Sequence, residues 1–120
     1  MKSYRSIKTL HDAINSYAAL PLNWDNDGAN PPTDKCITKS LDFLKCIPMD
    51  FQLPTIMLGQ NGSGAYIGFY WDDAQHYMDI EIDIHGEISC FKRDNMTGTE
   101  YYAENIEITP EWLVNHFSAT

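Results

Sequence analysis

The sequence predicts an α+β fold in which two N-terminal helices pack on an antiparallel meander sheet of four to five strands, followed by a short C-terminal helix. Apolar residues recur with the period of a helix up to about residue 47, and with a period of two from Pro54 onward. The segments of period two are joined by short turns rich in Gly, Asn and Asp, which favour antiparallel neighbours. With 120 residues, 43% of them hydrophobic, the chain fits one packed domain spanning residues 1–120.

Each N-terminal helix has a start and a stop signal. The first is expected to begin at a Ser6 cap and to stop before Pro21. The second is expected to begin at a Thr33 cap, with Asp34 at the positive end of its dipole, and to end before Pro48. The apolar stripes contain Ile7, Leu10, Ile14, Tyr17 and Ala18 in the first helix, and Ile37, Leu41 and Leu44 in the second.

The expected strands cover residues 55–58, 65–71, 77–85, 87–92 and 100–108. Thr109 and Pro110 then form a typical helix start, and Trp112, Leu113 and Phe117 are expected to dock that helix on the rest of the molecule. With helices on one face of the sheet, the other face is expected to lie in solvent.

Strand 77–85 is the most informative stretch because its two faces differ in chemistry. Its even positions are apolar, and its odd positions are Tyr77, Asp79, Glu81, Asp83 and His85. Because side chains alternate across a strand, the acids are predicted to point into solvent with about 6.7 Å between neighbours.

The net negative charge comes from one part of the chain. Residues 1–71 contain six basic and six acidic residues, whereas residues 72–120 contain eleven acidic residues and only Lys92 and Arg93, which gives 2 − 11 = −9. Such a field repels nucleic acid and anionic membrane and attracts basic partners to one region.

Cysteine spacing and hydropathy restrict the expected state of the thiols and the expected cellular location. Three cysteines (Cys36, Cys46 and Cys90) form no CxxC pair, which favours buried, reduced thiols over a disulfide framework or a zinc site. No apolar run is long enough for a membrane span, and no signal peptide is evident, so a cytoplasmic location is expected.

The loop at residues 23–34 partly fits a calcium-binding EF-hand loop, with oxygens at Asn23, Asp25 and Asp27, a glycine at position six and Asp34 at position twelve. Asn at position one, Asp instead of Glu at position twelve and two prolines weaken that fit. The alternative is a structured turn in which the acids accept backbone hydrogen bonds and Trp24 fills the core.

The same loop resembles a group of small uncharacterised bacterial and prophage proteins. The resemblance rests on residues 22–25, on Gly28 and Ala29 followed by proline, on Phe43 and Leu44, and on a Gly-rich hairpin leading to Trp71. It covers roughly residues 20–90, and its distinctive element is a Trp-Asp-x-x-Gly-Ala signature followed by proline. The position of Asp27 is not typically acidic in that group, which argues against a calcium role. The resemblance implies no activity, only that genes of this kind often lie on mobile elements.

Several interpretations of the acidic strand are open. A metal or acid–base cluster is disfavoured because neighbouring positions on one strand diverge, and an inverting glycosidase would need a cleft between its carboxylates. A solvated outer face is the simplest alternative. A third interpretation is that the carboxylates imitate a nucleic-acid backbone and compete for the same Lys and Arg residues, with exposed tyrosines (Tyr66, Tyr70, Tyr77, Tyr101 and Tyr102) as anchors.

The sequence therefore predicts a non-enzymatic, acidic, protein-binding inhibitor from a mobile element, of the anti-CRISPR, antitoxin or immunity type. The expected partner is a basic protein surface, belonging to a nucleic-acid-binding protein or a toxin, and neither nucleic acid nor a membrane is expected to bind directly. We expect no metal or cofactor, and a monomer or homodimer. The competing classes are a small metal-dependent enzyme and a self-associating structural subunit. The predicted partner-binding residues are Asp72, Asp73, Tyr77, Asp79, Glu81, Asp83, Glu87 and Trp24.

Overall fold

The structure is a computed structural model that describes residues 6–26, 28–62 and 64–118. Two helices come first, α1 (Ile7–Tyr17) and α2 (Asp34–Cys46). Five strands follow: β1 (Thr55–Asn61), β2 (Gly64–Asp72), β3 (His76–Ile82), β4 (Ile88–Asp94) and β5 (Glu100–Ala103). Helix α3 (Pro110–Ser118) ends the described chain. The predicted α+β class and its order of elements are confirmed.

The sheet is a meander in which each strand pairs with the next in an antiparallel direction, in the order β1-β2-β3-β4-β5. The register places Tyr70 opposite Asp79, and Asp79 in turn opposite Phe91. Glu81 lies between Gly68 on β2 and Ser89 on β4. The pairing of consecutive strands is what short turns favour, because a parallel neighbour would need a long crossover.

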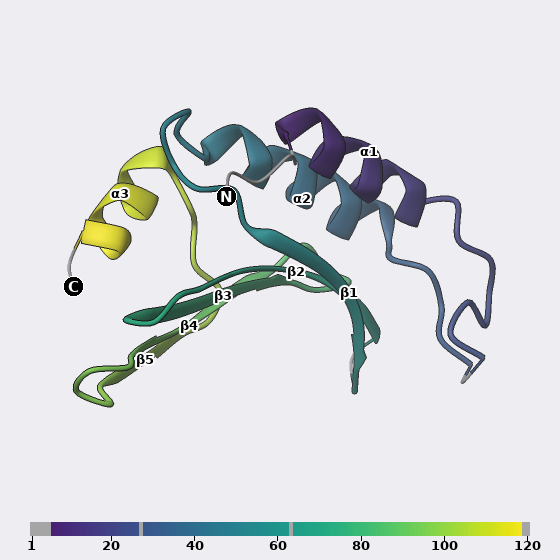
Figure 1. Cartoon of the computed structure of the whole chain (residues 1–120). Helices are drawn as coiled ribbons and strands as arrows, with labels where there is room; N and C mark the ends of the chain where they lie inside the picture. Colours follow the sequence, from purple (N-terminus) through teal and green to yellow (C-terminus); the bar gives the residue numbers. More distant parts are fainter. Residues whose placement is uncertain (1–5, 27, 63, 119–120) are drawn as a thin grey trace.

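Both N-terminal helices begin where their caps predict. The Ser6 side chain accepts a hydrogen bond from the Thr9 amide, and Thr33 accepts one from the Cys36 amide. Helix α2 contacts β2 and β3, whereas α1 packs on α2 and lies farther from the sheet. Figure 1 shows all three helices on the same side of the sheet, with the other side bare of helices.

The core lies between the helices and one face of the sheet. Its strand residues are the apolar alternates predicted from the sequence, namely Ala65, Ile67, Phe69 and Trp71 on β2 and Met78, Ile80 and Ile82 on β3. Phe43 from α2 lies with its ring centroid 4.6 Å from that of Phe69. Cys36 and Cys90 are buried in this core as free thiols, as predicted, while Cys46 is only partly buried.

Two strands end earlier than their sequence pattern predicts. Strand β3 stops at Ile82 instead of continuing to residue 85, because Asp83 begins a turn that passes through Gly86 at a φ of 76°. Strand β5 stops at Ala103, and Asn105 follows with a φ of 53°. A polar side chain that takes over backbone hydrogen bonds, or a residue in the left-handed region, ends a strand whatever the alternation around it.

No helix among the described residues has the length and apolar composition needed to cross a membrane.

Candidate functional site

The candidate site is the side of the sheet that no described helix covers in Figure 1, which we call the open face. Its residues are the strand positions that alternate with the core positions. They include Thr55, Met57 and Gly59 on β1, Tyr66, Gly68, Tyr70 and Asp72 on β2, Tyr77, Asp79 and Glu81 on β3, Ser89, Phe91 and Arg93 on β4, and Glu100 and Tyr102 on β5. The open face therefore combines aromatic rings with two carboxylates at its centre.

Asp79 and Glu81 are half-buried, which differs from the solvent-exposed position that the sequence predicts. Aromatic neighbours on the adjacent strands take part of the space around Asp79, and the Tyr77 hydroxyl donates a hydrogen bond of 3.1 Å to its Oδ2 atom. Burial raises the pKa of Asp79, an effect that the Tyr77 hydrogen bond partly offsets. Burial raises the pKa of Glu81 too, with a further contribution from the charge of Asp79.

Neither carboxylate has a cationic partner among the residues that the structure describes. The ion pairs there join Lys8 to Asp12, Lys45 to Asp42 and His76 to Asp73, all away from the centre of the open face. Arg93 is the one basic residue in our open-face set, and its guanidinium lies 5.5 Å from the centroid of the Tyr77 ring. The two acids thus carry negative charge that is partly removed from water and that no described side chain neutralises.

A cavity of about 280 Å³ opens beside Glu81. It is lined by four carboxylates and two phenol rings, contributed by Glu81, Asp83, Glu87, Glu104, Tyr66 and Tyr102. Burial, followed by the charges of Glu81 and Asp79, raises the pKa of Tyr66. Burial, followed by the charge of Glu104, raises the pKa of Tyr102. The cavity thus has an acidic lining with neutral aromatic walls.

Asp83 reaches this cavity from a turn and not from the predicted strand. Its Oδ1 atom accepts hydrogen bonds from the amides of His85 and Glu87, both at 2.9 Å. The prediction of three acids in a row on one strand face is therefore wrong at Asp83. Glu87, which precedes β4, still lies close enough to line the same cavity as Glu81.

The other predicted site residues lie at the end of the open face or away from it. Asp72 lies opposite Tyr77 at the end of β2, on the open face. The adjacent Asp73 accepts hydrogen bonds from the amides of Gln75 and His76. These two hydrogen bonds lower the pKa of Asp73. Trp24 belongs to the loop between α1 and α2, where its Nε1 donates to the Asn30 carbonyl at 2.7 Å. The structure thus gathers Tyr77, Asp79, Glu81, Asp83 and Glu87, places Asp72 beside Tyr77 at the end of the same face, and leaves Asp73 and Trp24 outside.

The loop at residues 23–34 has the hydrogen bonds expected of a structured turn. The side-chain oxygen of Asn23 accepts from the Gly28 amide at 2.6 Å, and Oδ1 of Asp25 accepts from the Ala29 amide at 3.0 Å. Asp34 is the first residue of α2, and Asp27 lies outside the described residues. Among the described residues, no group of three or more His, Cys, Asp or Glu side chains is arranged to hold a metal ion.

Glu104 is a site residue that the sequence reasoning missed. Alternation from Tyr102 places it on the same side of the chain, so a signal was present. The signal could not be used without knowing that β5 pairs with β4, which brings residues 102–104 beside Ser89 and Glu81. Gly59 is a second such residue, because a side chain at that position would collide with the Tyr66 ring.

Comparison of the chain with protein-family models, with curated proteins and with solved structures found no match.

Proposed function

We propose that this protein is a non-enzymatic inhibitor of the anti-CRISPR, antitoxin or immunity type, and that it occupies a basic surface of its target with the open face. The observation that supports this proposal best is that Asp79 and Glu81 have no cationic partner among the described residues and lie on a sheet face that no described helix covers. A half-buried carboxylate without a counter-ion destabilises the fold that carries it. A cationic side chain from a partner would remove that cost on binding.

The aromatic residues around the two acids also favour binding of a cationic side chain. Lysine and arginine bind over the faces of tyrosine rings, and tyrosine is enriched among the residues that dominate binding energy at protein interfaces. Tyr66 and Tyr102 line the acidic cavity together with Glu81. The binding mode that follows is a Lys or Arg side chain of the target inserted into this cavity, with Asp79 and its aromatic neighbours covered by the surrounding target surface.

The charge distribution supports a nucleic-acid-binding surface, or a basic toxin, as the target. The charge of −9 belongs to residues 72–120, which include β3, β4 and β5. Such a field steers a basic partner toward this side and repels nucleic acid itself. Surfaces that bind phosphate backbones depend on Lys and Arg, so a protein that occupies those side chains blocks nucleic-acid binding.

Affinity capture from a bacterial lysate tests the proposal with two double variants that remove the same charge. Asp79→Asn with Glu81→Gln alters the open face, whereas Asp12→Asn with Asp42→Asn alters exposed acids on the helices. We expect the unaltered protein and the helix variant to capture the same basic proteins, and the open-face variant to lose them. Raising the salt concentration should release them, because the contact is electrostatic.

Equal capture by all three proteins would reject the proposal, provided that their circular dichroism spectra agree. Self-association through the open face is the competing outcome. It would appear in light scattering as a mass that rises with concentration and returns to that of a monomer in the open-face variant.

A further inference from the structure

A second cavity, of about 340 Å³, lies on the helix-covered side of the sheet and shares no lining residue with the acidic cavity. Four register neighbours from adjacent strands form one wall, namely Trp71 on β2, Met78 on β3, Lys92 on β4 and Tyr101 on β5. His116 and Phe117 of α3 line it from the other side. Its volume is at the lower end of the range of about 300–1,000 Å³ typical of small-molecule sites.

The aromatic residues of this cavity are held by contacts of their own. Trp71 donates from Nε1 to the Gln52 carbonyl at 2.7 Å, and its ring meets Phe117 edge-on with centroids 4.9 Å apart. His116 stacks on Trp112 at 3.6 Å. Rings fixed in this way offer a preformed apolar surface to a flat ligand, since little side-chain entropy remains to be lost on binding.

Two basic residues of β4, Lys92 and Arg93, line this cavity, and Lys92 is the one on the wall formed by Trp71, Met78 and Tyr101. Its ammonium donates to the His116 carbonyl at 3.1 Å and lies 5.5 Å from the centroid of the Tyr101 ring. None of the ion pairs in the described part of the chain includes it. An ammonium has three donors, so a single carbonyl leaves capacity for an anionic ligand.

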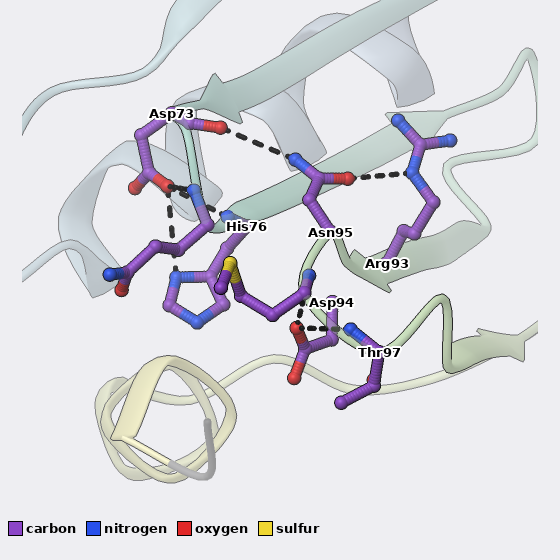
Figure 2. A network of polar contacts seen from close by, with 8 residues as sticks. Asp73, His76, Arg93, Asp94, Asn95 and Thr97 are labelled. Atoms are coloured by element: carbon purple, nitrogen blue, oxygen red, sulfur yellow. Dashed lines mark hydrogen bonds and ion pairs between the residues drawn. The ribbon is translucent and has the colours of Figure 1, made fainter.

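Three acids line the cavity. Glu100 lies opposite Arg93 in the register of β4 and β5, and the other two, Asp73 and Asp94, accept hydrogen bonds within their own turns. Oδ1 of Asp73 accepts from two backbone amides, and Oδ1 of Asp94 accepts from the amides of Met96 and Thr97. Figure 2 shows Asn95 between these turns, where it donates to the Asp73 carbonyl and accepts from Nε of Arg93. The entrance is therefore a pair of linked turns, and no rim carboxylate pairs with Lys92.

We infer that this cavity binds a small aromatic carboxylate, with the rings of the ligand against Trp71, Tyr101 and Phe117 and its carboxylate on the Lys92 ammonium. The carboxylate gives Lys92 the anionic partner that no described side chain supplies. The volume of the cavity is sufficient for one aromatic ring or for two fused rings. Tyr77 and Arg93 of the open face also line this cavity, but it shares no lining residue with the acidic cavity beside Glu81, so this inference does not depend on the proposed function.

The test is a titration of the ¹⁵N-labelled full-length chain with 2-naphthoate, followed by amide NMR shifts, and a parallel titration with the neutral 2-naphthalenemethanol. We expect saturable shifts at Trp71, Met78, Lys92 and Tyr101, and affinity for the alcohol that is weaker by about tenfold. Lys92→Met should reduce the affinity for naphthoate to that for the alcohol. Lys45→Met, a change of the same kind at an exposed position on α2, should bind as the unaltered protein does.

The inference is overturned if naphthoate produces no saturable shift, or if the acid and the alcohol bind the unaltered protein equally well. That comparison needs no variant, so it decides the matter even if Lys92→Met, which also removes a hydrogen bond to α3, fails to fold. Equal naphthoate affinity in a folded Lys92→Met protein would likewise overturn it.

Discussion

Glu81 and Asp83 are two positions apart in the sequence, yet their carboxylates have opposite relations to the fold. Glu81 is half-buried without a described cationic partner, and burial raises its pKa. Asp83 accepts two backbone hydrogen bonds that hold the turn between β3 and β4. The charge on Glu81 therefore opposes folding, whereas the Asp83 side chain supports it.

Glu81→Gln is expected to raise the free energy of unfolding at pH 7, by up to about 1 kcal/mol. Because the pKa of Glu81 is raised in the folded state, the folded protein binds this proton more tightly than the unfolded chain does. The stability of the unaltered protein should thus fall as pH rises from the ordinary glutamate pKa through the raised one. The advantage of the variant should be largest above that window and disappear below it, as measured by urea unfolding across pH 4–8.

Asp83→Ala is the matched comparison for Glu81→Gln, and it should lower the free energy of unfolding instead of raising it. Loss of two hydrogen bonds to backbone amides is expected to cost about 1–3 kcal/mol at pH 7. If both variants lowered the stability by similar amounts, the distinction between a binding carboxylate and a structural one would be wrong.

The core thiols give a second prediction at this scale. Burial raises the pKa of Cys36 to about 11 and that of Cys90 to about 12. Since the thiolate is the reactive form, iodoacetamide at pH 8 should modify neither residue in the folded protein and both in urea. Peptide mass spectrometry measures this directly, and rapid labelling of either cysteine without denaturant would contradict the packing described above.

At the scale of the elements, Thr33 connects the start of α2 to the acidic end of the sheet. Its hydroxyl oxygen accepts from the Cys36 amide and its hydroxyl donates to the Ile84 carbonyl, within the turn that Asp83 holds. A helix cap and a tertiary contact thus share one side chain.

Thr33→Ala is expected to lower the stability by about 1–2 kcal/mol, because it removes both the cap and the link to the turn. Ser6→Ala removes the cap of α1, whose hydroxyl contacts, among the described residues, only the amide and the hydroxyl of Thr9 within the same turn. This variant should lower the stability by less than Thr33→Ala does. Thr33→Ser should restore most of the loss. Urea unfolding of the three variants gives the ranking, and equal effects at positions 6 and 33 would show that the contact with Ile84 contributes nothing.

Periodicity and caps were sufficient to predict the order of the elements and the buried face of β2 and β3. The ends of β3 and β5 were not predictable in the same way. At Asp83 the alternation continues in the sequence, but a side-chain hydrogen bond ends the strand. At Asn105 the alternation shifts by one position, and a left-handed backbone follows the end of the strand. Local hydrogen bonding overrides hydrophobic pattern at such positions.

At the scale of the whole molecule, the sheet separates two different environments. The helix-covered side contains the core and the cavity beside Lys92, and the open face contains Asp79, Glu81 and most of their aromatic neighbours. The uneven charge of the sequence indicated the acidic open face. It did not indicate the cavity beside Lys92, because Lys92 and the aromatic residues around it come from four strands and a helix that only the topology brings together.

The sequence also could not show how the acidic residues are distributed. Alternation correctly placed Asp79 and Glu81 on one face, but it could not show that neighbouring strands cover them or that Glu104 joins them. Burial of a strand residue depends on cross-strand neighbours, which are set by register and strand order and not by local pattern.

The most direct test of the proposed binding site is a ¹³C NMR titration of the side-chain carboxyl groups, with and without a short lysine-rich peptide. Without the peptide, Asp79 and Glu81 should titrate above their ordinary pKa, and bound lysine should lower the pKa of both because it stabilises the charged forms. Ordinary pKa values for both groups, or peptide-induced shifts that are as large at the exposed Asp12 and Asp42 as at Asp79 and Glu81, would contradict the account.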